Sequence, residues 1–328
     1  MHVKFWGVRG SIPRPADSEE LTTRLVEALY RLGQESDYLD LSDRDALHDW
    51  VAQLPPSINA FTGGNTPCVE VSCGGETLII DLGSGLRALG EALMKREFGK
   101  GKGRAHLFLS HLHHDHIQGW PFFRPAYIEG NQFELYSHQA DVRQRLIQQQ
   151  QAPFFPPESL RDMRAQVNCH QLTGETQILC DGRLKVRSLE LDHPSAAYAF
   201  RFECGGKTLV YASDGAFPAP DKGADDPARP FIEFFRDADL VIIDAQFSLA
   251  ESLSKRSWGH SSAVVGVELA AHANTKRLAL FHHDPYASDA LLEHLLRVGR
   301  EYAANPPAPC QSNGVEVFLA REGQTISL

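Results

Sequence analysis

Two segments of this chain repeat one another, and this repeat constrains the fold more than any other feature. Residues 73–83 read Cys-Gly-Gly-Glu-Thr-Leu-Ile-Ile-Asp-Leu-Gly, and residues 204–215 read Cys-Gly-Gly-Lys-Thr-Leu-Val-Tyr-Ala-Ser-Asp-Gly. A Gly-Gly turn followed by an apolar run is typical of a hairpin that continues into a buried strand. Each copy then delivers an aspartate, Asp81 or Asp214. We therefore predict two similar β-rich halves, with convergent hairpin chemistry as the alternative.

Strand-like runs recur along the whole chain. They are rich in Val, Ile, Leu and Phe, are bounded by Gly, Pro or Asp, and have helical stretches between several of them. The first eight residues also alternate like a strand. This rhythm predicts an α/β fold. The runs are 66–73, 77–83, 105–111, 133–138, 184–191, 197–204, 207–214, 240–246, 277–281 and 315–320.

Two stretches break the strand rhythm. Residues 14–60 are polar and helix-like, and residues 139–170 are Gln-rich and then contain Pro-Phe-Phe-Pro-Pro. We expect a single domain over residues 1–328, with these two stretches as helical insertions over or beside the sheets. Four leucines of the first stretch recur at helical spacing: Leu21, Leu25, Leu29 and Leu32.

Composition and charge narrow the class of protein. No apolar run is long enough to cross a bilayer, and the N-terminus does not resemble a secretory signal, so we expect a cytoplasmic protein without a membrane partner. The six cysteines lack CxxC spacing and are expected to be reduced, buried thiols. The formal net charge of −10 disfavours long RNA or DNA as a partner.

The strand-like run 105–111 leads into a cluster of histidines and one aspartate. Alternation on an extended backbone sends His111 and His113 to the same side, and a turn brings Asp115 and His116 to a second metal position. The spacing H-x-H-x-D-H rarely arises by chance. A metal-ligand cluster is therefore favoured over core histidines that serve packing alone.

Further ligands have to come from the ends of other strands. His193, Asp214 and either His282 or His283 each lie at or just after the end of a strand-like run. A single histidine is more often structural than functional, but together with the cluster these residues complete two coordination spheres. The spacing leaves His282 and His283 as alternatives.

With these motifs the chain resembles the metallo-β-lactamase superfamily, and within it the branch of ribonuclease Z and the bacterial cyclic phosphodiesterases. The resemblance runs from Val3 to about residue 320, apart from the two insertions. It implies a four-layer αββα sandwich of two similar halves, a homodimer, and two divalent metal ions. Zinc is the expected metal, with manganese or iron as alternatives.

The resemblance also implies how the ligands are shared. Asp81 matches the aspartate that orients ligands in this superfamily without binding metal. His282 takes the ligand place, because residues 280–285, Leu-Phe-His-His-Asp-Pro, align with the ribonuclease Z pattern Leu-Thr-His-Phe-Ser. The implied ligands are His111, His113 and His193 for one ion, and Asp115, His116 and His282 for the other, with Asp214 as the bridge.

Two further segments are similar to ribonuclease Z. Residues 243–247, Ile-Asp-Ala-Gln-Phe, resemble its His-Glu-Ala-Thr-Phe, and residues 259–262, Gly-His-Ser-Ser, resemble its Gly-His-Ser-Thr. We expect His260, oriented by Asp244, to protonate the departing oxygen, while Asp115 also orients the attacking water. A helix start capped by one of the serines is the other interpretation of the second segment, and both can hold.

Substrate contacts are expected in two loops. Gly64, Asn65 and Thr66 can offer backbone N–H groups to a phosphate, although Gly-rich turns are commonplace. Phe154 and Phe155 are available to stack on a base, with simple packing between prolines as the alternative.

Together these features predict a metal-dependent phosphodiesterase that hydrolyses a small phosphodiester, such as a cyclic nucleotide or cyclic phosphate, by two-metal activation of water. The alternatives are a ribonuclease Z-like RNA 3′-end endonuclease and a non-catalytic metal-dependent regulatory module. The negative charge favours a small substrate, and so does the lack of the flexible Gly/Pro-rich arm with which ribonuclease Z grips tRNA. The full set of candidate ligands favours an enzyme over a non-catalytic module.

Overall fold

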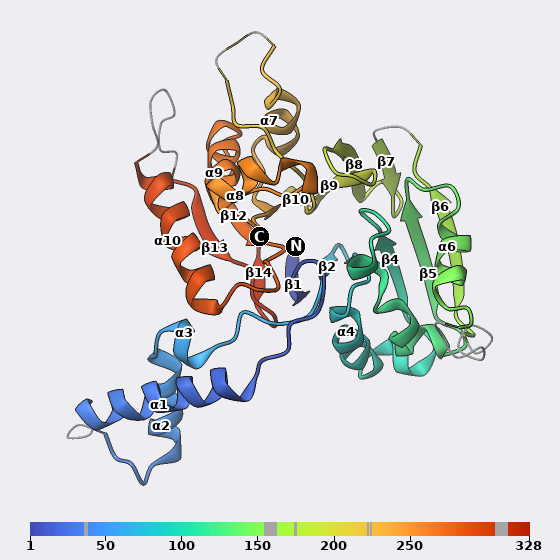
Figure 1. Ribbon diagram of the computed structural model, residues 1–328. Helices are drawn as coiled ribbons and strands as arrows, with labels where there is room; N and C mark the ends of the chain where they lie inside the picture. The colour runs from blue at the N-terminus through green and yellow to red at the C-terminus, as the bar shows by residue number, and fades with distance from the viewer. Residues whose placement is uncertain (36–38, 154–162, 174–175, 222, 224, 306–313) are drawn as a thin grey trace.

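The computed structural model describes residues 1–328 except 36–38, 154–162, 174–175, 222, 224 and 306–313. Two seven-stranded sheets pack face to face within the described residues, and helices cover their outer faces (Figure 1). The first sheet has the order β14-β1-β2-β3-β4-β5-β6, and the second has the order β13-β12-β11-β10-β9-β8-β7.

All ten strand-like runs of the sequence form strands, and so do the first residues of the chain. The first sheet consists of β1 His2–Gly7, β2 Cys68–Cys73, β3 Glu76–Ile80, β4 Arg104–Phe108, β5 Gln132–Ser137, β6 Gln166–Gln171 and β14 Thr325–Ser327. The second consists of β7 Thr176–Leu179, β8 Leu184–Leu191, β9 Ala197–Cys204, β10 Lys207–Ala212, β11 Leu240–Asp244, β12 Arg277–Phe281 and β13 Glu316–Leu319. The α-helices are α1 Ser18–Glu35, α2 Arg44–Gln53, α3 Pro56–Asn59, α4 Gly85–Met94, α5 His114–Ile117, α6 Val142–Gln149, α7 Arg229–Phe235, α8 Leu249–Ser254, α9 Ala263–His272 and α10 Asp289–Ala304.

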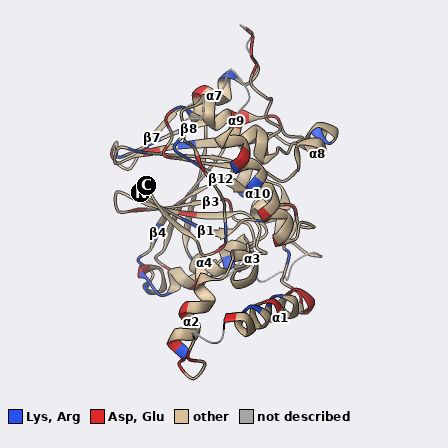
Figure 2. Ribbon diagram, turned by 90° about the vertical axis from the view of Figure 1, so that its left-hand side faces the viewer, with Lys and Arg blue, Asp and Glu red and all other residues tan. Residues whose placement is uncertain are grey.

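Alternation of apolar side chains along the strands builds three cores. On β3, Leu78 and Ile80 join the core between the two sheets, whereas Ile79 joins a core with the leucines of α4. A third core packs the second sheet against α7, α9 and α10. The fold is therefore the four-layer αββα sandwich that the sequence predicts, and Figure 2 shows this order from α4 through β3 and β12 to α9.

The two halves share one strand plan, which confirms the predicted internal similarity. In the first half, β1, β2 and β3 are antiparallel and β3 to β6 are parallel. In the second half, β8, β9 and β10 are antiparallel and β10 to β13 are parallel. Asp81 and Asp214 lie just beyond β3 and β10, and both adopt left-handed backbone angles, with φ of 58° and 60°.

The expectation of reduced cysteines is wrong for one pair. Cys73 and Cys204 form a disulfide that joins the two sheets, with a Cα–Cα distance of 6.4 Å. Each ends the first strand of its Gly-Gly hairpin, so the internal similarity places the two equivalent turns opposite one another. Cys68, Cys169 and Cys180 are free. Because disulfides are uncommon in the cytosol, the cytoplasmic location stays a prediction.

Residues 14–60, here called the helical arm, contain α1, α2 and α3, and the first two extend away from the sheets in Figure 1. The predicted leucine stripe does not pack into the sandwich, since Leu21, Leu25 and Leu29 are 48%, 55% and 65% exposed. A polar contact anchors the arm instead, because Arg24 on α1 donates a hydrogen bond to the buried Asp289 of α10.

The region 139–170 divides into α6 and most of β6, which extends the first sheet beside β5. Phe154 and Phe155 lie outside the described residues. In the part of the chain that the structure describes, no helix has the length and apolar character needed to cross a membrane.

Candidate metal centre

The turn after β4 and the ends of β8, β10 and β12 meet at one edge of the sandwich. The carboxyl ends of parallel strands lie at the same edge, so residues far apart in the sequence converge there. The seven predicted ligands form two compact groups. Within each group the donor atoms lie within 4.8 Å of one another. The first group is His111, His113 and His193, and the second is Asp115, His116, Asp214 and His282.

Three imidazoles form the first group. Nε2 of His193 lies 3.1 Å from Nδ1 of His113. Nε2 of His111 is buried and has no hydrogen-bond partner, which is costly for a ring nitrogen unless it binds something else. Burial lowers the pKa of His111 far below its ordinary value, so this imidazole is neutral and has a lone pair to offer. The group therefore fits a divalent cation.

The second group surrounds two carboxylates with imidazoles. Oδ2 of Asp214 lies 3.1 Å from Nε2 of His116, and its Oδ1 lies 3.3 Å from Nε2 of His282. Nε2 of His282 is also 3.2 Å from Oδ2 of Asp115. Asp214 reaches toward the first group as well, since its Oδ1 is 3.9 Å from Nε2 of His111. Its Oδ1 therefore faces His111 of the first group and His282 of the second, while its Oδ2 faces His116.

Electrostatics in the second group also suit a cation. Burial alone would raise the pKa of Asp214, but the imidazoles of His116 and His282 hold it well below its ordinary value. Burial alone would lower the pKa of His116, but the carboxylates of Asp214, Asp115 and Asp81 raise it. A proton on His116 thus compensates part of the buried carboxylate charge, and a metal ion can take over that compensation.

Asp81 lies behind the second group and contacts protein donors. Its Oδ2 is 2.7 Å from Nδ1 of His116 and accepts hydrogen bonds from Tyr211 Oη at 2.7 Å and Ser110 Oγ at 2.8 Å. Its Oδ1 accepts a further bond from the backbone N–H of Ser110 at 2.8 Å. The Nε2 atom of His116 is thereby turned toward Asp214.

Other imidazoles are oriented through their outer nitrogens in the same way. Nδ1 of His193 lies 3.1 Å from the carbonyl oxygen of Gly259, and Nε2 of His113 lies 2.7 Å from Ser195 Oγ. Nδ1 of His282 lies 3.0 Å from Oε1 of Gln246. Sequence reasoning did not foresee the contacts of Ser195 and Gln246. Such partners fix ring orientation and increase ligand basicity.

The structure separates the two neighbouring histidines after β12. His282 adopts a left-handed backbone angle, with φ of 57°, and points into the second group. His283 points away, where its Nε2 bonds to the carbonyl oxygen of Ala320 at 3.0 Å. Burial and the nearby Arg9 guanidinium lower the pKa of His283 to about 3. A side chain at Gly10 would come within 2.6 Å of the His282 ring, so the loop after β1 needs glycine there.

A carboxylate–imidazole pair lies beside the metal groups. Oδ2 of Asp244, the last residue of β11, is 2.8 Å from Nδ1 of His260, and the His260 ring stacks on His282 at 5.1 Å. Burial alone would lower the pKa of His260, but Asp244 and the other carboxylates raise it to about 9. Ser262 caps α9 by accepting from Val265 N–H, so the helix-start interpretation holds alongside this pair.

The glycine-rich loop before β2 contacts the site through its side chains. Thr66 Oγ1 donates a hydrogen bond to the carbonyl oxygen of Asp115 at 2.7 Å. The side-chain amide of Asn65 bonds to Glu322 at 3.0 Å, and the carbonyl of Gly64 accepts from Arg14 N–H at 2.7 Å. These contacts position the loop beneath Asp115, and the predicted substrate contacts of these residues stay predictions.

Comparison with known proteins identifies the family. A model described as the beta-lactamase superfamily domain matches residues 77–283, which include every residue of both metal groups. The chain belongs to the metallo-β-lactamase superfamily. It is accordingly a metal-dependent hydrolase of this superfamily, as the sequence analysis predicts.

Several relatives of this superfamily member carry informative names. Ribonuclease Z of Natronomonas pharaonis is 25% identical over 317 residues, which cover 81% of this chain and 93% of that protein. Ribonuclease Z of Halorubrum lacusprofundi is 28% identical over 275 residues, covering 70% and 86%. The metallo-β-lactamase fold protein YhfI of Bacillus subtilis has a TM-score of 0.59 at 19% identity, covering 99% and 98%. Human tRNase Z, short form, has a TM-score of 0.58 at 17% identity, covering 100% and 99%.

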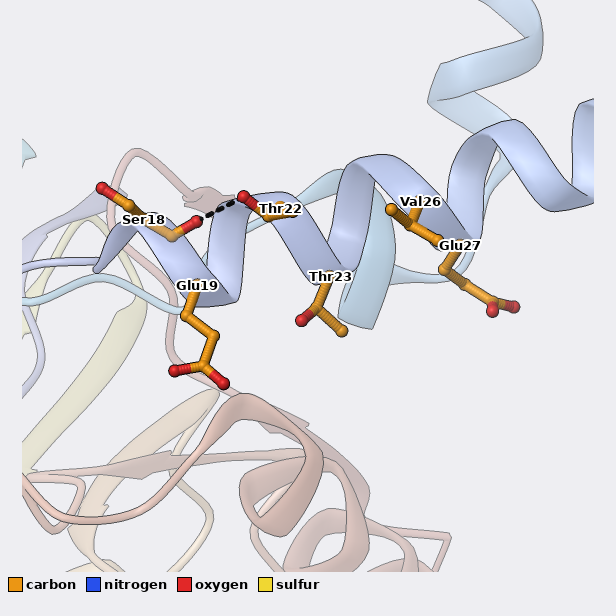
Figure 3. Close-up of a pocket in the computed structure, with 6 residues that line it drawn as sticks. All are labelled: Ser18, Glu19, Thr22, Thr23, Val26 and Glu27. Atoms are coloured by element: carbon orange, nitrogen blue, oxygen red, sulfur yellow. Dashed lines mark hydrogen bonds between the residues drawn. The ribbon is translucent and has the colours of Figure 1, made fainter.

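A cavity of about 560 Å³ lies apart from the metal groups, along α1 of the helical arm (Figure 3). Its lining offers hydroxyls, carboxylates and one valine, but no imidazole or thiol. One of the hydroxyls is already bonded, because Thr22 donates to the carbonyl oxygen of Ser18 at 2.7 Å. The lining residues are Ser18, Glu19, Thr22, Thr23, Val26 and Glu27.

Proposed function

We propose that this hydrolase cleaves phosphodiesters with two divalent metal ions, zinc being the expected metal and manganese or iron the alternatives. The observation that carries the proposal is the convergence of seven donor side chains into two adjoining groups, with Asp214 facing both and the Asp244–His260 pair beside them. His111, His113 and His193 would hold one ion. Asp115, His116 and His282 would hold the other, with Asp214 shared.

When bound, two such ions supply Lewis acidity and a nucleophilic water at neutral pH. Side chains of the protein orient the attacking water and supply the proton for the departing oxygen. Asp115 is held by the backbone N–H of Ser11 at 2.8 Å and orients the attacking water through its carboxylate. His260 donates a proton to the departing oxygen, and Asp244 keeps its ring in place and favours the charged form. Asp81 acts only by orienting His116.

Two observations bear on the size of the substrate. The relatives named ribonuclease Z favour RNA and weaken the charge-based argument against a long nucleic acid. The helical arm favours a small phosphodiester, because residues 14–60 contain ten acidic and four basic side chains and would repel phosphates (Figure 2). We propose a small phosphodiester, such as a cyclic nucleotide or cyclic phosphate, with RNA 3′-end processing as the second candidate.

A substrate panel tests the proposal. The purified chain, loaded with Zn²⁺ or Mn²⁺, is incubated with cyclic nucleotides, cyclic dinucleotides, bis(p-nitrophenyl) phosphate and precursor tRNA. Hydrolysis of the small esters with little cleavage of the RNA is expected. Cleavage of the precursor tRNA alone would support RNA 3′-end processing instead. No turnover of any phosphodiester, with metal bound, would contradict both.

Replacing His260 tests the proton donor. A sugar alkoxide is a poor leaving group, whereas p-nitrophenolate leaves without help near neutral pH. His260→Ala should therefore slow a sugar phosphodiester by about 10²–10⁴-fold and the chromogenic ester much less. His48→Ala, which removes an exposed imidazole on α2, is the matched control and should change neither rate. Equal losses on both substrates at unchanged metal content would mean that His260 supports only the fold or the metal groups.

A further inference from the structure

A separate group of three side chains of the metal-ligand type lies beside β4, away from the edge that carries the two metal groups. Glu76 begins β3, His106 lies in the middle of β4, and Cys180 follows β7 of the second sheet. Their donor atoms all lie within 4.8 Å of one another. His106 precedes His111 by five residues, and the two groups share no residue. The proposed catalytic chemistry uses none of the three.

The donor atoms already stand at distances that a metal site requires. Sγ of Cys180 lies 3.4 Å from Nε2 of His106, and that nitrogen lies 3.8 Å from Oε2 of Glu76. In a tetrahedral zinc site, with Zn–S of about 2.3 Å and Zn–N of about 2.0 Å, sulfur and nitrogen ligands are about 3.5 Å apart. The thiol and the imidazole therefore need little movement to share one ion.

Neighbouring side chains hold the donors in this orientation. Nδ1 of His106 faces the hydroxyl of Tyr136 at 3.4 Å, and the two rings stack at 5.9 Å, which directs Nε2 toward Cys180. Oε1 of Glu76 accepts a hydrogen bond from Arg183 at 2.7 Å, which leaves Oε2 toward His106. These contacts resemble the outer partners that fix ligand orientation in metal sites.

The backbone also directs the thiol into this group. Cys180 and Asp181 adopt left-handed backbone angles, with φ of 54° and 55°, which non-glycine residues adopt infrequently. The turn borders a cavity of about 270 Å³ that Glu76, His106 and Cys180 line together with Glu134 and Asp181. The lining also contains the guanidinium groups of Arg104 and Arg183, so the case for a cation rests on the three donor atoms, and the cavity leaves room for a fourth ligand such as water.

We propose that Glu76, His106 and Cys180 bind a third divalent cation of the thiophilic type, such as Zn²⁺, and so join the first sheet to the β7–β8 turn of the second. The donor set selects the kind of metal, because thiolate and imidazole suit zinc and cobalt whereas Mg²⁺ and Ca²⁺ prefer oxygen ligands. The site stabilises the sandwich near the Cys73–Cys204 disulfide and takes no part in hydrolysis.

Cobalt titration of the full chain separates this site from the catalytic pair. The two catalytic groups contain only imidazoles and carboxylates, so a thiolate-to-cobalt charge-transfer band in the near ultraviolet reports a cysteine ligand. The metal-free chain should develop this band on addition of Co²⁺, and metal analysis should reach three equivalents. Cys180→Ser should abolish the band and remove one equivalent. Cys169→Ser is the matched control, since it removes another half-buried free thiol, and should keep both.

A second variant covers the case in which Cys180→Ser does not fold. His106→Gln should weaken the cobalt affinity measured from the band by at least about tenfold, and it should reduce the rise in melting temperature that Zn²⁺ produces beyond two equivalents. The proposal is overturned if the wild-type chain shows no band at saturating Co²⁺. It is also overturned if the band persists in Cys180→Ser, or if His106→Gln retains wild-type affinity.

Discussion

Asp81 and Asp214 occupy equivalent positions in the two halves but have different surroundings. Each follows the last antiparallel strand of its half, is buried, and adopts a left-handed backbone angle. The oxygens of Asp81 meet Ser110, Tyr211 and Nδ1 of His116, all of which are protein partners within the fold. The oxygens of Asp214 instead face Nε2 atoms of His111, His116 and His282, and Oδ2 also accepts a hydrogen bond from Ser213 Oγ.

This difference shows how one structural unit, used twice, can place an aspartate in two different surroundings. The position of the aspartate is set by the hairpin and strand of each half. The surroundings of each carboxylate then combine residues of its own half with residues of the other half. Tyr211 belongs to the second half and bonds to Asp81, whereas His111 and His116 belong to the first half and face Asp214.

The largest effect is expected at Asp214. Asp214→Asn removes the shared anionic ligand while leaving the apolar strand β10 intact. We expect kcat/KM to fall by about 10³-fold or more, because Lewis-acid stabilisation is worth several kcal/mol, and the bound metal to fall below two equivalents at the catalytic groups. Kinetics and metal analysis at saturating Zn²⁺ check this, with circular dichroism as the control for folding. Near-normal turnover would show that the ligand assignment is wrong.

The disulfide joins the equivalent turns of the two halves, so its removal tests how much that link stabilises the sandwich. The double variant Cys73→Ser with Cys204→Ser should lose about 2–4 kcal/mol of unfolding free energy, because a cross-link over 131 residues restricts the unfolded chain. Turnover of the folded enzyme should be unchanged. Urea denaturation measures the loss, and Cys169→Ser serves as the comparison. Equal midpoints for all three proteins would contradict the prediction.

Asp81→Asn should have a smaller effect than Asp214→Asn. The amide keeps the shape of the side chain but removes the negative charge beside Nδ1 of His116. We expect the affinity for the second metal ion to fall by about 10–100-fold, with activity restored at high metal concentration. Titration with Zn²⁺ during turnover measures the shift. If added metal failed to restore activity, Asp81 would have a direct role in the chemistry.

The smallest effect is expected at Tyr211, which supplies one of the four contacts of Asp81. Tyr211→Phe leaves the other three contacts in place. Unfolding free energy should fall by about 1 kcal/mol, and metal affinity should fall by less than the Asp81 variant loses. Denaturation and metal titration of both variants provide the comparison. A loss as large as that of Asp81→Asn would mean that the inter-half hydrogen bond controls the metal site.

Sequence alone determined the parts of this protein that depend on local patterns. Alternating apolar residues and the Gly-Gly turns predicted the ten strands and the internal similarity, because side-chain period and turn chemistry are properties of short segments, whereas the αββα class followed from the family resemblance. The spacing from His111 to His116 predicted a metal cluster for the same reason. Position at strand ends then indicated His193 and Asp214, since parallel strands bring their carboxyl ends to one edge.

Only the tertiary structure decided between residues whose local sequence positions are equivalent. His282 and His283 are neighbours after one strand, and the left-handed turn at His282 sends one ring to the second group of candidate ligands and the other to Ala320. The pairing of Cys73 with Cys204, the exposure of the leucines on α1 and the convergence of Glu76 with Cys180 were equally open. Each depends on how one sheet lies over the other, and that arrangement is fixed by contacts between residues distant in the sequence.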